Sequence, residues 1–438
     1  MKSFDVLILG GGIAGNAVAY NLALLRPQSR IAIIDPLNYG ELKASVVTFM
    51  EHLQRYGLKK SVVHKYRSQR FESISNIGYS TTMEEEAFAL VDYGVACQSL
   101  QERSGCEVIR DRFLKKEGNK IYLESGLTLT ADYFVDTMGL FSPLRDQMNL
   151  EKPELRTALL FGTYKVNQSD LRTDTFCYVV GNGVFDGYTS NGGWIYPSGE
   201  DTVEIGSAFL VWDKAGTFRI DKMMRAALEK SLDQIIDTFF PGAILTGELH
   251  ERITAYSPTK QVVEDDVLFL GDVAGTGDPF LCANCSRYLD MSEHLASALN
   301  LALRDRKQSH LDRYQKVWNY ELVHYSKRRL GRAEILFKKT PEEWDNILLM
   351  RKNRSAKKTL ESRMGKVGYT MKYTLKRYPI KDVLGLFLTE MKFHWKMKLM
   401  NPQPPELDYF NKLRDIQDVM KTTSPRLHTQ AKITGGWN

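Results

Sequence analysis

The decisive stretch is Asp5-Val6-Leu7-Ile8-Leu9-Gly10-Gly11-Gly12-Ile13-Ala14-Gly15. Its first five residues are mainly aliphatic, which predicts a buried strand that stops at the glycines. Residues 14–25 are rich in Ala and Leu and favour a helix. Residues 31–34, Ile-Ala-Ile-Ile, predict a second buried strand. A strand, a helix and a strand within about thirty residues have the length of a βαβ crossover.

The glycines in this stretch have the spacing of a dinucleotide-binding turn. Gly10 allows the tight turn, Gly12 lets a pyrophosphate approach the backbone, and Gly15 lets the helix pack closely on the strand. The helix N-terminus offers free N–H groups and a positive dipole end to phosphates. Asp35 ends the second strand, where a carboxylate can accept hydrogen bonds from both ribose hydroxyls. Further contacts to the dinucleotide are expected from Ile13, Ala14 and Pro36.

Two later segments indicate which dinucleotide is bound. Residues 136–145 read Asp-Thr-Met-Gly-Leu-Phe-Ser-Pro-Leu-Arg, and residues 271–275 read Gly-Asp-Val-Ala-Gly. In these segments the chain resembles the FAD-dependent superfamily of geranylgeranyl reductases, flavin-dependent halogenases and aromatic hydroxylases. The resemblance implies that FAD is the cofactor and that Asp272 binds its ribityl chain. It also implies that the helix after Pro279 directs its N-terminus at the flavin, where a positive dipole stabilises the anionic reduced ring. The same resemblance adds to the expected cofactor contacts Gly139, Gly271 and Asn284.

A further segment bears on the substrate. Residues 193–197, Gly-Trp-Ile-Tyr-Pro, resemble the Trp-x-Phe-Pro segment of geranylgeranyl reductases. Halogenases carry a related Trp-x-Trp-x-Ile-Pro segment, whose first Trp position is Gly192 here. In both families this strand lines the cavity beside the isoalloxazine ring, so Trp194 and Tyr196 are candidate substrate-facing residues. Ordinary packing within a sheet is the alternative, because buried Trp and Tyr are common.

Two departures from the superfamily pattern concern the flavin end of the site. Relatives place an Arg after the Asp at the start of a helix, whereas this chain has Asp92-Tyr93. Relatives also have glycines where this chain has Cys282-x-x-Cys285. A thiol at a helix N-terminus has a lowered pKa, so Cys282 is a candidate for electron exchange with the flavin or attachment to it. The alternative is that both cysteines are small core residues. A zinc site would need two more ligands, and none stands out at suitable spacing.

The predicted fold class is α/β, or α+β overall. We expect a Rossmann-type FAD-binding domain made of residues 1–150 and 255–310. Residues 151–254, with alternating patterns and frequent turn signals, predict an antiparallel-sheet substrate domain. Residues 311–438 predict a basic helical C-terminal region. Within the first domain we expect a polar connection up to about residue 80 and a helix over 83–103.

Charge and composition limit the partners. The 438-residue chain has a net charge of +6, and residues 351–400 contain fourteen Lys or Arg against three Asp or Glu. Such a segment suits peripheral contact with an anionic membrane or carrier, and a solvated helical face is the alternative. No nucleic-acid partner is expected. The sequence contains no apolar run of 18 residues, and its five cysteines are scattered and odd in number. These features predict free thiols and a cytoplasmic protein.

Three functions remain open on the sequence. The first is a reductase of the geranylgeranyl type that reduces C=C bonds of a hydrophobic organic substrate. The second is a monooxygenase or halogenase that acts through a flavin C4a-hydroperoxide. The third is an FAD protein without substrate chemistry of its own, against which the extensive antiparallel region argues. Since no separate NAD(P)H domain is recognised, electrons must come from an external donor, which is reduced flavin, NAD(P)H or a reductase.

Overall fold

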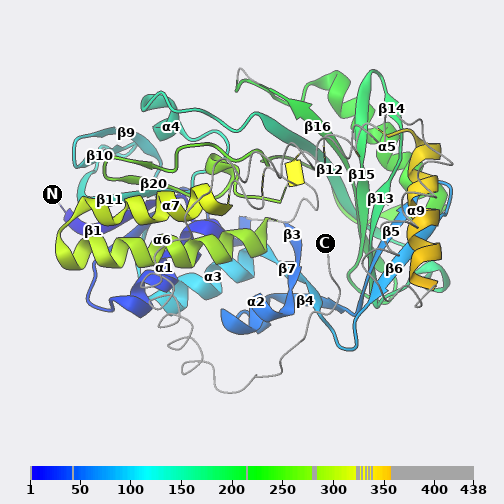
Figure 1. Ribbon diagram of the computed structural model, residues 1–438, viewed down its shortest axis with the longest axis horizontal. Coiled ribbons are helices and arrows are strands. Elements are labelled where there is room, and N and C mark those ends of the chain that lie inside the picture. The colour runs from blue at the N-terminus through cyan, green and yellow to red at the C-terminus, as the bar shows by residue number, and fades with distance from the viewer. Residues whose placement is uncertain are drawn as a thin grey trace, which may run out of the picture.

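The computed structural model describes residues 2–41, 44–213, 216–278, 284–321 and 339–356, together with residues 326, 329–330, 333 and 336. Figure 1 shows two large β-sheets side by side, with a small three-stranded sheet between them in the lower part of the view. Most of the basic segment, residues 351–400, lies outside the described residues. The predicted site residues Pro279 and Cys282 lie outside them as well.

The first sheet has the N-terminal strand near its centre. Its order is β19-β20-β11-β1-β2-β8, and β1 pairs in parallel with both β2 and β11. β10 and β9 extend it as an antiparallel hairpin. The strands are β1 (Lys2–Leu9), β2 (Ile31–Ile34), β8 (Glu107–Ile109), β9 (Phe113–Glu117), β10 (Lys120–Leu123), β11 (Thr128–Asp136), β19 (Val263–Glu264) and β20 (Val267–Phe269). This arrangement confirms the predicted βαβ unit and the α/β class.

The largest hydrophobic core joins this sheet to four helices. They are α1 (Ile13–Leu25), α3 (Tyr93–Ser104), α6 (Cys285–Asp305) and α7 (Asp312–Glu321). Every residue of α1 from Ile13 to Leu22 is buried, because the helix packs against β2, α3 and α6. Short elements at the edges of this part are α4 (Pro143–Gln147), η1 (Tyr39–Glu41), η4 (Asp272–Ala274) and η5 (Gln308–His310).

The second sheet is mainly antiparallel. Its order is β17-β12-β16-β15-β13-β5-β6, with β18 paired to β12 and β14 paired to β15. The strands are β5 (Ser68–Ser73), β6 (Gly78–Thr82), β12 (Leu155–Lys165), β13 (Thr175–Val180), β14 (Val184–Phe185), β15 (Tyr188–Pro197), β16 (Thr202–Trp212), β17 (Ile244–Leu245) and β18 (His250–Ala255). η3 (Gln168–Asp170) lies between β12 and β13. The antiparallel pairing agrees with the antiparallel sheet predicted within residues 151–254, and β5 joins this sheet by parallel pairing with β13.

Alternation along the strands gives this sheet two different faces. On β16, the side chains of Val203, Ile205 and Phe209 pack in a core with α5 (Lys222–Phe239). Glu204 and Ala208 point to the other face, which borders a cavity. A further helix, α9 (Pro341–Ala356), packs on β5 and β6 and lies at that end of the sheet in Figure 1. One face of the sheet is therefore core, and the other is available for a site.

The expectation for residues 45–103 was wrong in part. The structure has a small sheet of order β3-β7-β4, formed by β3 (Ser45–Phe49), β4 (Val62–Tyr66) and β7 (Phe88–Asp92). It is accompanied by α2 (Met50–Arg55) and η2 (Lys59–Ser61). The helix predicted over 83–103 begins only at Tyr93, because Asp92 caps it by accepting a hydrogen bond from the Val95 nitrogen at 2.9 Å. The residues before this cap form a buried strand.

None of the helices in the described part of the chain has both the length and the hydropathy that crossing a bilayer requires. The four cysteines for which the structure gives a placement, Cys97, Cys106, Cys177 and Cys285, are free and buried. This agrees with the predicted free thiols.

Candidate functional site

The glycine turn after β1 is as tight as the sequence predicts. Gly10 has φ +102°, and a Cβ there would lie 2.6 Å from the Thr137 carbonyl oxygen. A Cβ on Gly15 would lie 2.1 Å from the Gly10 carbonyl oxygen. Any side chain at these positions would push α1 away from the ends of β1 and β11. The glycines thus bring the N-terminus of α1 to the carboxyl edge of the sheet, where α/β proteins bind nucleotides.

Asp35 follows β2 at the same edge. One of its carboxylate oxygens accepts a hydrogen bond from the Gly11 nitrogen at 2.5 Å, and the other accepts one from the Leu37 nitrogen at 2.8 Å. Each oxygen has a second lone pair, so the carboxylate retains capacity for a ribose hydroxyl. Pro36 is exposed beside it. The structure therefore brings the glycine turn and Asp35 together, as expected.

The second predicted motif lies against the first. Gly271, two residues after β20, has φ +94°, and a Cβ added there would lie 3.4 Å from the Ala14 Cβ. Asp272 follows in η4 and accepts a hydrogen bond from the Tyr288 hydroxyl. Burial raises the pKa of Asp272, although the charge of Arg252 opposes this shift. Two motifs that are far apart in the sequence thus share one site.

Gly139 and Asn284 are the remaining described positions of the predicted cofactor set. Gly139 has φ +83°, with no atom within 4 Å of an added Cβ, so it borders open space. Asn284 directly precedes α6, and its Oδ1 atom is buried with no hydrogen-bond partner among the described residues. A buried acceptor without a donor is costly in a finished core. It is suited to an N–H group of a bound ring.

Tyr93 is the main unexpected neighbour of the nucleotide turn. Its hydroxyl accepts a hydrogen bond from the Ile13 nitrogen at 3.0 Å, at the start of α1. A Cβ on Gly12 would lie 2.9 Å from the same hydroxyl oxygen. The superfamily pattern that the sequence resembles has an Arg here, so Tyr93 offers a neutral hydroxyl where that pattern has a cation. Burial raises the pKa of Tyr93 well above its usual value, which keeps the hydroxyl protonated.

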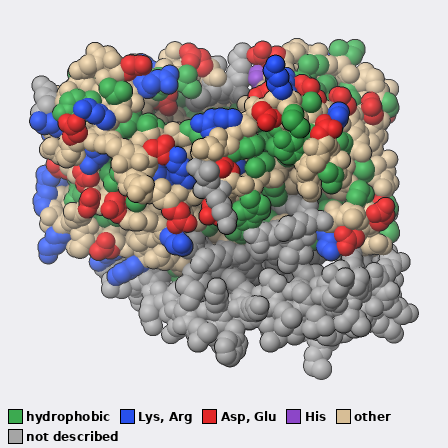
Figure 2. Space-filling model, turned by 90° about the horizontal axis from the view of Figure 1, so that it is seen from above, with side chains coloured by type: hydrophobic (Ala, Val, Ile, Leu, Met, Phe, Trp, Pro, Cys, Tyr) green, Lys and Arg blue, Asp and Glu red, His purple; other side chains and the backbone are tan. Residues whose placement is uncertain are grey.

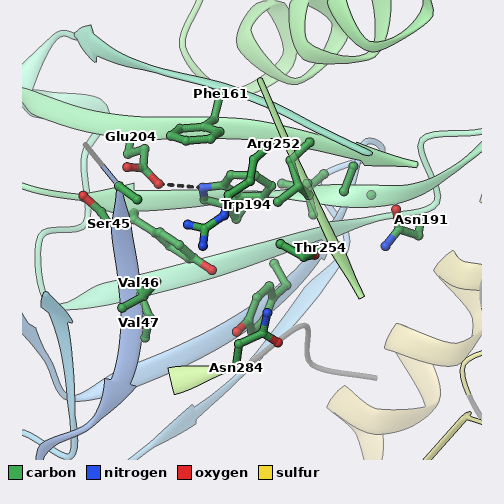
Figure 3. A pocket seen from close by; sticks show the side chains of 18 of the residues that line it. Ser45, Val46, Val47, Phe161, Asn191, Trp194, Glu204, Arg252, Thr254 and Asn284 are labelled. Atoms are coloured by element: carbon green, nitrogen blue, oxygen red, sulfur yellow. Dashed lines mark hydrogen bonds between the residues drawn. The ribbon is translucent and has the colours of Figure 1, made fainter. Parts of the chain in front are cut away.

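An apolar cavity of about 140 Å³ lies between this turn region and the second sheet. Its walls come from β3, from the start of α6 and from the face of the second sheet opposite α5 (Figure 3). Trp194 and Tyr196, both predicted as substrate-facing, line it. They are two residues apart on β15, so they project from the same face of the sheet. The other aromatic residues that line the cavity are Phe71, Tyr93, Phe161, Tyr178, Tyr256, Tyr288 and Trp344.

Glu204 is the acidic group in the wall of this cavity. Trp194 Nε1 donates a hydrogen bond to Glu204 Oε1 at 2.9 Å (Figure 3). Glu204 is only 6% exposed. Burial raises its pKa to about 7, although hydrogen bonds from Trp194 and Ser45 act in the opposite direction. The indole has room to reach it because the facing residue is Gly206, where a Cβ would lie 2.1 Å from the Trp194 ring.

Sequence reasoning did not identify Glu204 as a site residue. It stands between Val203 and Ile205 in a strand, where simple alternation predicts a side chain in solvent. The available signal lay in the pairing of two strands. Glu204 pairs with Tyr196 in the register of β15 and β16, two pairs away from Trp194 and therefore on the same face. A carboxylate beside two candidate site aromatics is therefore recognisable once the hairpin is aligned.

Arg252 on β18 brings a positive charge to the same cavity. Its guanidinium lies 5.4 Å from the centre of the Tyr93 ring, and Figure 3 shows it beside Trp194. Burial acts to lower the pKa of Arg252, but the nearby Tyr93 and Asp272 raise it overall. Arg252 thus remains charged and links the cavity to the Asp272 motif.

A second, polar cavity of about 290 Å³ lies beside the first. Its polar side chains include Asp92, Gln98 and His250. The residues that line both cavities are Ala44, Ser45, Phe161 and Glu204. Glu204 therefore lies at the boundary between an apolar and a polar compartment.

Comparison with known proteins agrees with these motifs. No protein-family model matches the chain. It is 21% identical over 376 residues to digeranylgeranylglycerophospholipid reductase of Haloferax volcanii, covering 79% of this chain and 88% of that protein. It is 22% identical over 391 residues to digeranylgeranylglycerophospholipid reductase 1 of Methanococcoides burtonii, covering 81% and 89%.

Solved structures show the same fold. A geranylgeranyl bacteriochlorophyll reductase-like protein from Thermoplasma acidophilum has a TM-score of 0.71 at 16% identity, covering 88% of this chain and 99% of that one. The myxobacterial FAD-dependent halogenase CndH has a TM-score of 0.59 at 16% identity, covering 83% and 92%. PqsL of Pseudomonas aeruginosa, described as a probable FAD-dependent monooxygenase, has a TM-score of 0.58 at 16% identity, covering 78% and 98%. These similarities confirm the resemblance drawn from the sequence: the chain has the fold of the FAD-dependent geranylgeranyl reductase, halogenase and hydroxylase-like superfamily.

Proposed function

We propose that this protein is an FAD-dependent oxidoreductase that reduces C=C bonds of an isoprenoid or lipid-like substrate. The observation that carries the proposal is the aromatic-lined cavity, which extends from Asn284 and Tyr288 at the start of α6 to Trp194 on the second sheet. Such a wall suits a hydrophobic chain. The names of both curated relatives, digeranylgeranylglycerophospholipid reductases, support this substrate class.

FAD is the proposed cofactor, and the residues present fit it. The amides at the start of α1 and the Asp35 carboxylate would hold the pyrophosphate and the adenosine ribose. Asp272 would hold the ribityl chain. Asn284 Oδ1, which has no hydrogen-bond partner among the described residues, would accept a hydrogen bond from a ring N–H. Bound and reduced, FAD supplies a hydride equivalent to a double bond. Tyr93 would have to share the Ile13 amide with the pyrophosphate.

Trp194 and Tyr196 are proposed to position the substrate. Their rings lie 6.0 Å apart at 33° and form a continuous aromatic surface with Phe161. An alkene held against this surface is shielded from water, which favours hydride transfer over side reactions. A role for Cys282 in electron exchange remains a proposal on a residue outside the described part of the chain.

Electrons are proposed to come from an external donor, which is reduced flavin, NAD(P)H or a reductase. Contact with an anionic membrane or carrier is proposed for residues 351–400. On the described part of the face in Figure 2, Lys and Arg side chains are interspersed with Asp and Glu, and neither sign forms one large patch. The basic segment is therefore the stronger candidate for an anionic surface.

The test starts from protein that has been reduced in the absence of oxygen. The FAD-loaded protein is reduced with dithionite and mixed either with a digeranylgeranylglycerophospholipid in detergent or with oxygenated buffer. Reoxidation by the lipid, with saturated product detected by mass spectrometry, supports the reductase. A persistent C4a-hydroperoxide spectrum with oxygen, and no reaction with the lipid, would replace it with monooxygenase or halogenase chemistry.

A further inference from the structure

Two cavities of different polarity meet at one carboxyl group. We propose that Glu204 is the acid that protonates the substrate carbon in the apolar cavity and is itself reprotonated from the polar cavity. This inference rests on the proposed C=C reduction, which needs one proton for each hydride equivalent.

The position of Glu204 is fixed by its neighbours. The Trp194 indole donates to Oε1 at 2.9 Å, which leaves the proton of the acid form on Oε2. Glu204 is paired with Tyr196 on β15 and with Thr163 on β12, so its backbone is held from both sides. Trp194 is held in turn by Gly206 beneath it and by Phe161, whose ring centre is 5.8 Å away. The Glu204 carboxyl group is therefore held in one orientation at the cavity wall.

The surroundings of Glu204 leave it about half protonated near pH 7. Burial favours its protonated form, and the groups that oppose burial are the two neutral donors Trp194 and Ser45. Arg252 lines the same cavity from β18. The groups that raise its pKa are the Asp272 carboxylate and the hydroxyls of Tyr93, Tyr288 and Tyr256. Asp92 and His250 are the other titratable side chains, besides Tyr39, that line the polar cavity together with Glu204. Tyr66 and Tyr196 are near enough for the Glu204 charge to raise their pKa values.

The other acids that line the apolar cavity are poorer proton donors. Burial raises the pKa of Tyr93, Tyr196 and Tyr288 well above the usual tyrosine value. Burial also raises the pKa of the Cys285 thiol to about 12. A general acid works best when its pKa is close to the working pH. Among the described residues of the cavity wall, Glu204 meets that condition.

The proton balance uses both cavities. Reduction breaks the alkene π bond and forms two C–H bonds, one with the hydride equivalent from the reduced cofactor and one with the Glu204 proton. The resulting carboxylate takes a proton from water in the polar cavity. That cavity, of about 290 Å³, has room for several waters, since a water occupies roughly 30 Å³ in the liquid. Proton entry therefore does not require water in the apolar cavity.

The experiment combines two readouts on Glu204→Gln, which removes the proton but keeps the shape and the Trp194 hydrogen bond. Infrared difference spectra between wild type and E204Q, recorded without substrate, should contain a protonated-carboxyl C=O band that disappears as pH rises through about 7. Reoxidation of the dithionite-reduced protein by digeranylgeranylglycerophospholipid should slow by roughly 100-fold or more in E204Q. Dithionite reduction and FAD affinity should stay within about twofold. Glu248→Gln, at an exposed acid, should match wild type.

The outcomes are separable. If the lipid does not reoxidise the reduced wild-type protein, both the proposed reductase activity and the acid role of Glu204 are overturned. A wild type that reacts while E204Q reacts equally fast, or a missing carboxyl band, overturns the acid role alone. If E204Q does not fold, Trp194→Phe serves instead. Loss of the indole donor should move the pH midpoint of the reaction upward, whereas a purely structural defect would lower the rate without moving that midpoint.

Discussion

The Tyr93 hydroxyl lies 3.0 Å from the Ile13 nitrogen, where it occupies an amide that a dinucleotide phosphate would need. We therefore expect Tyr93→Phe to bind FAD about fivefold more tightly, since one net hydrogen bond of roughly 1 kcal/mol no longer has to be exchanged. Quenching of FAD fluorescence on titration measures this. Weaker binding in Y93F would mean that the hydroxyl contacts the cofactor itself.

Gly15 and Gly139 provide a matched pair for the glycine turn. A Cβ at Gly15 would lie 2.1 Å from a backbone oxygen, which cannot move without shifting α1. Gly15→Ala should therefore cost about 3 kcal/mol or more of unfolding free energy and abolish FAD binding. The Cβ of Gly139→Ala would meet no atom within 4 Å, so the positive φ of this residue is the only source of strain. This substitution should therefore cost about 1 kcal/mol of unfolding free energy. Urea denaturation of both variants makes the comparison, and equal costs would contradict the close packing.

The nucleotide half of the site could be predicted because its residues are tied to backbone geometry. Gly10 and Gly15 are required by contacts with Thr137 and with the turn itself. The Gly271 and Asp272 motif follows a parallel strand, and strands of that kind end at the same edge of the sheet. The meeting of the two motifs at one edge of the sheet could therefore be expected from the sequence, and the structure adds the close approach of Gly271 to Ala14.

The rest depended on tertiary packing that short patterns do not encode. β4 alternates exposed and partly buried residues around His64 and Lys65, which resembles a polar connection. α5 was missed because turn signals surround it, although Met224, Ala227 and Leu228 have helical spacing. Glu204 is buried in contact with Trp194 of β15 and with Ser45 at the start of β3. Its environment exists only after two distant segments meet.

Residues 351–400 should bring the full chain to anionic vesicles. Fourteen basic against three acidic residues provide attraction of about 1 kcal/mol for each Lys or Arg that reaches the lipid surface. We expect sedimentation with phosphatidylglycerol vesicles at low salt, little with phosphatidylcholine vesicles, and release at about 0.5 M salt, where charges are screened within a few ångströms. Equal binding to both lipids would point to apolar insertion instead of charge.

The protonation of Glu204 should be visible in stability as well as in catalysis. Its pKa is about 7 in the folded protein and about 4.3 in an unfolded chain. Because the folded state holds the proton more tightly, this group's contribution is fully present below about pH 4.3 and is lost as pH rises through 7. Relative to Glu204→Gln, the wild type should thus lose up to about 3 kcal/mol of unfolding free energy between pH 5 and pH 8. Urea denaturation at several pH values measures the difference, in which other titrating groups cancel. Glu248→Gln should run parallel to wild type, and an E204Q curve that also runs parallel would show that Glu204 is already ionised in the folded protein.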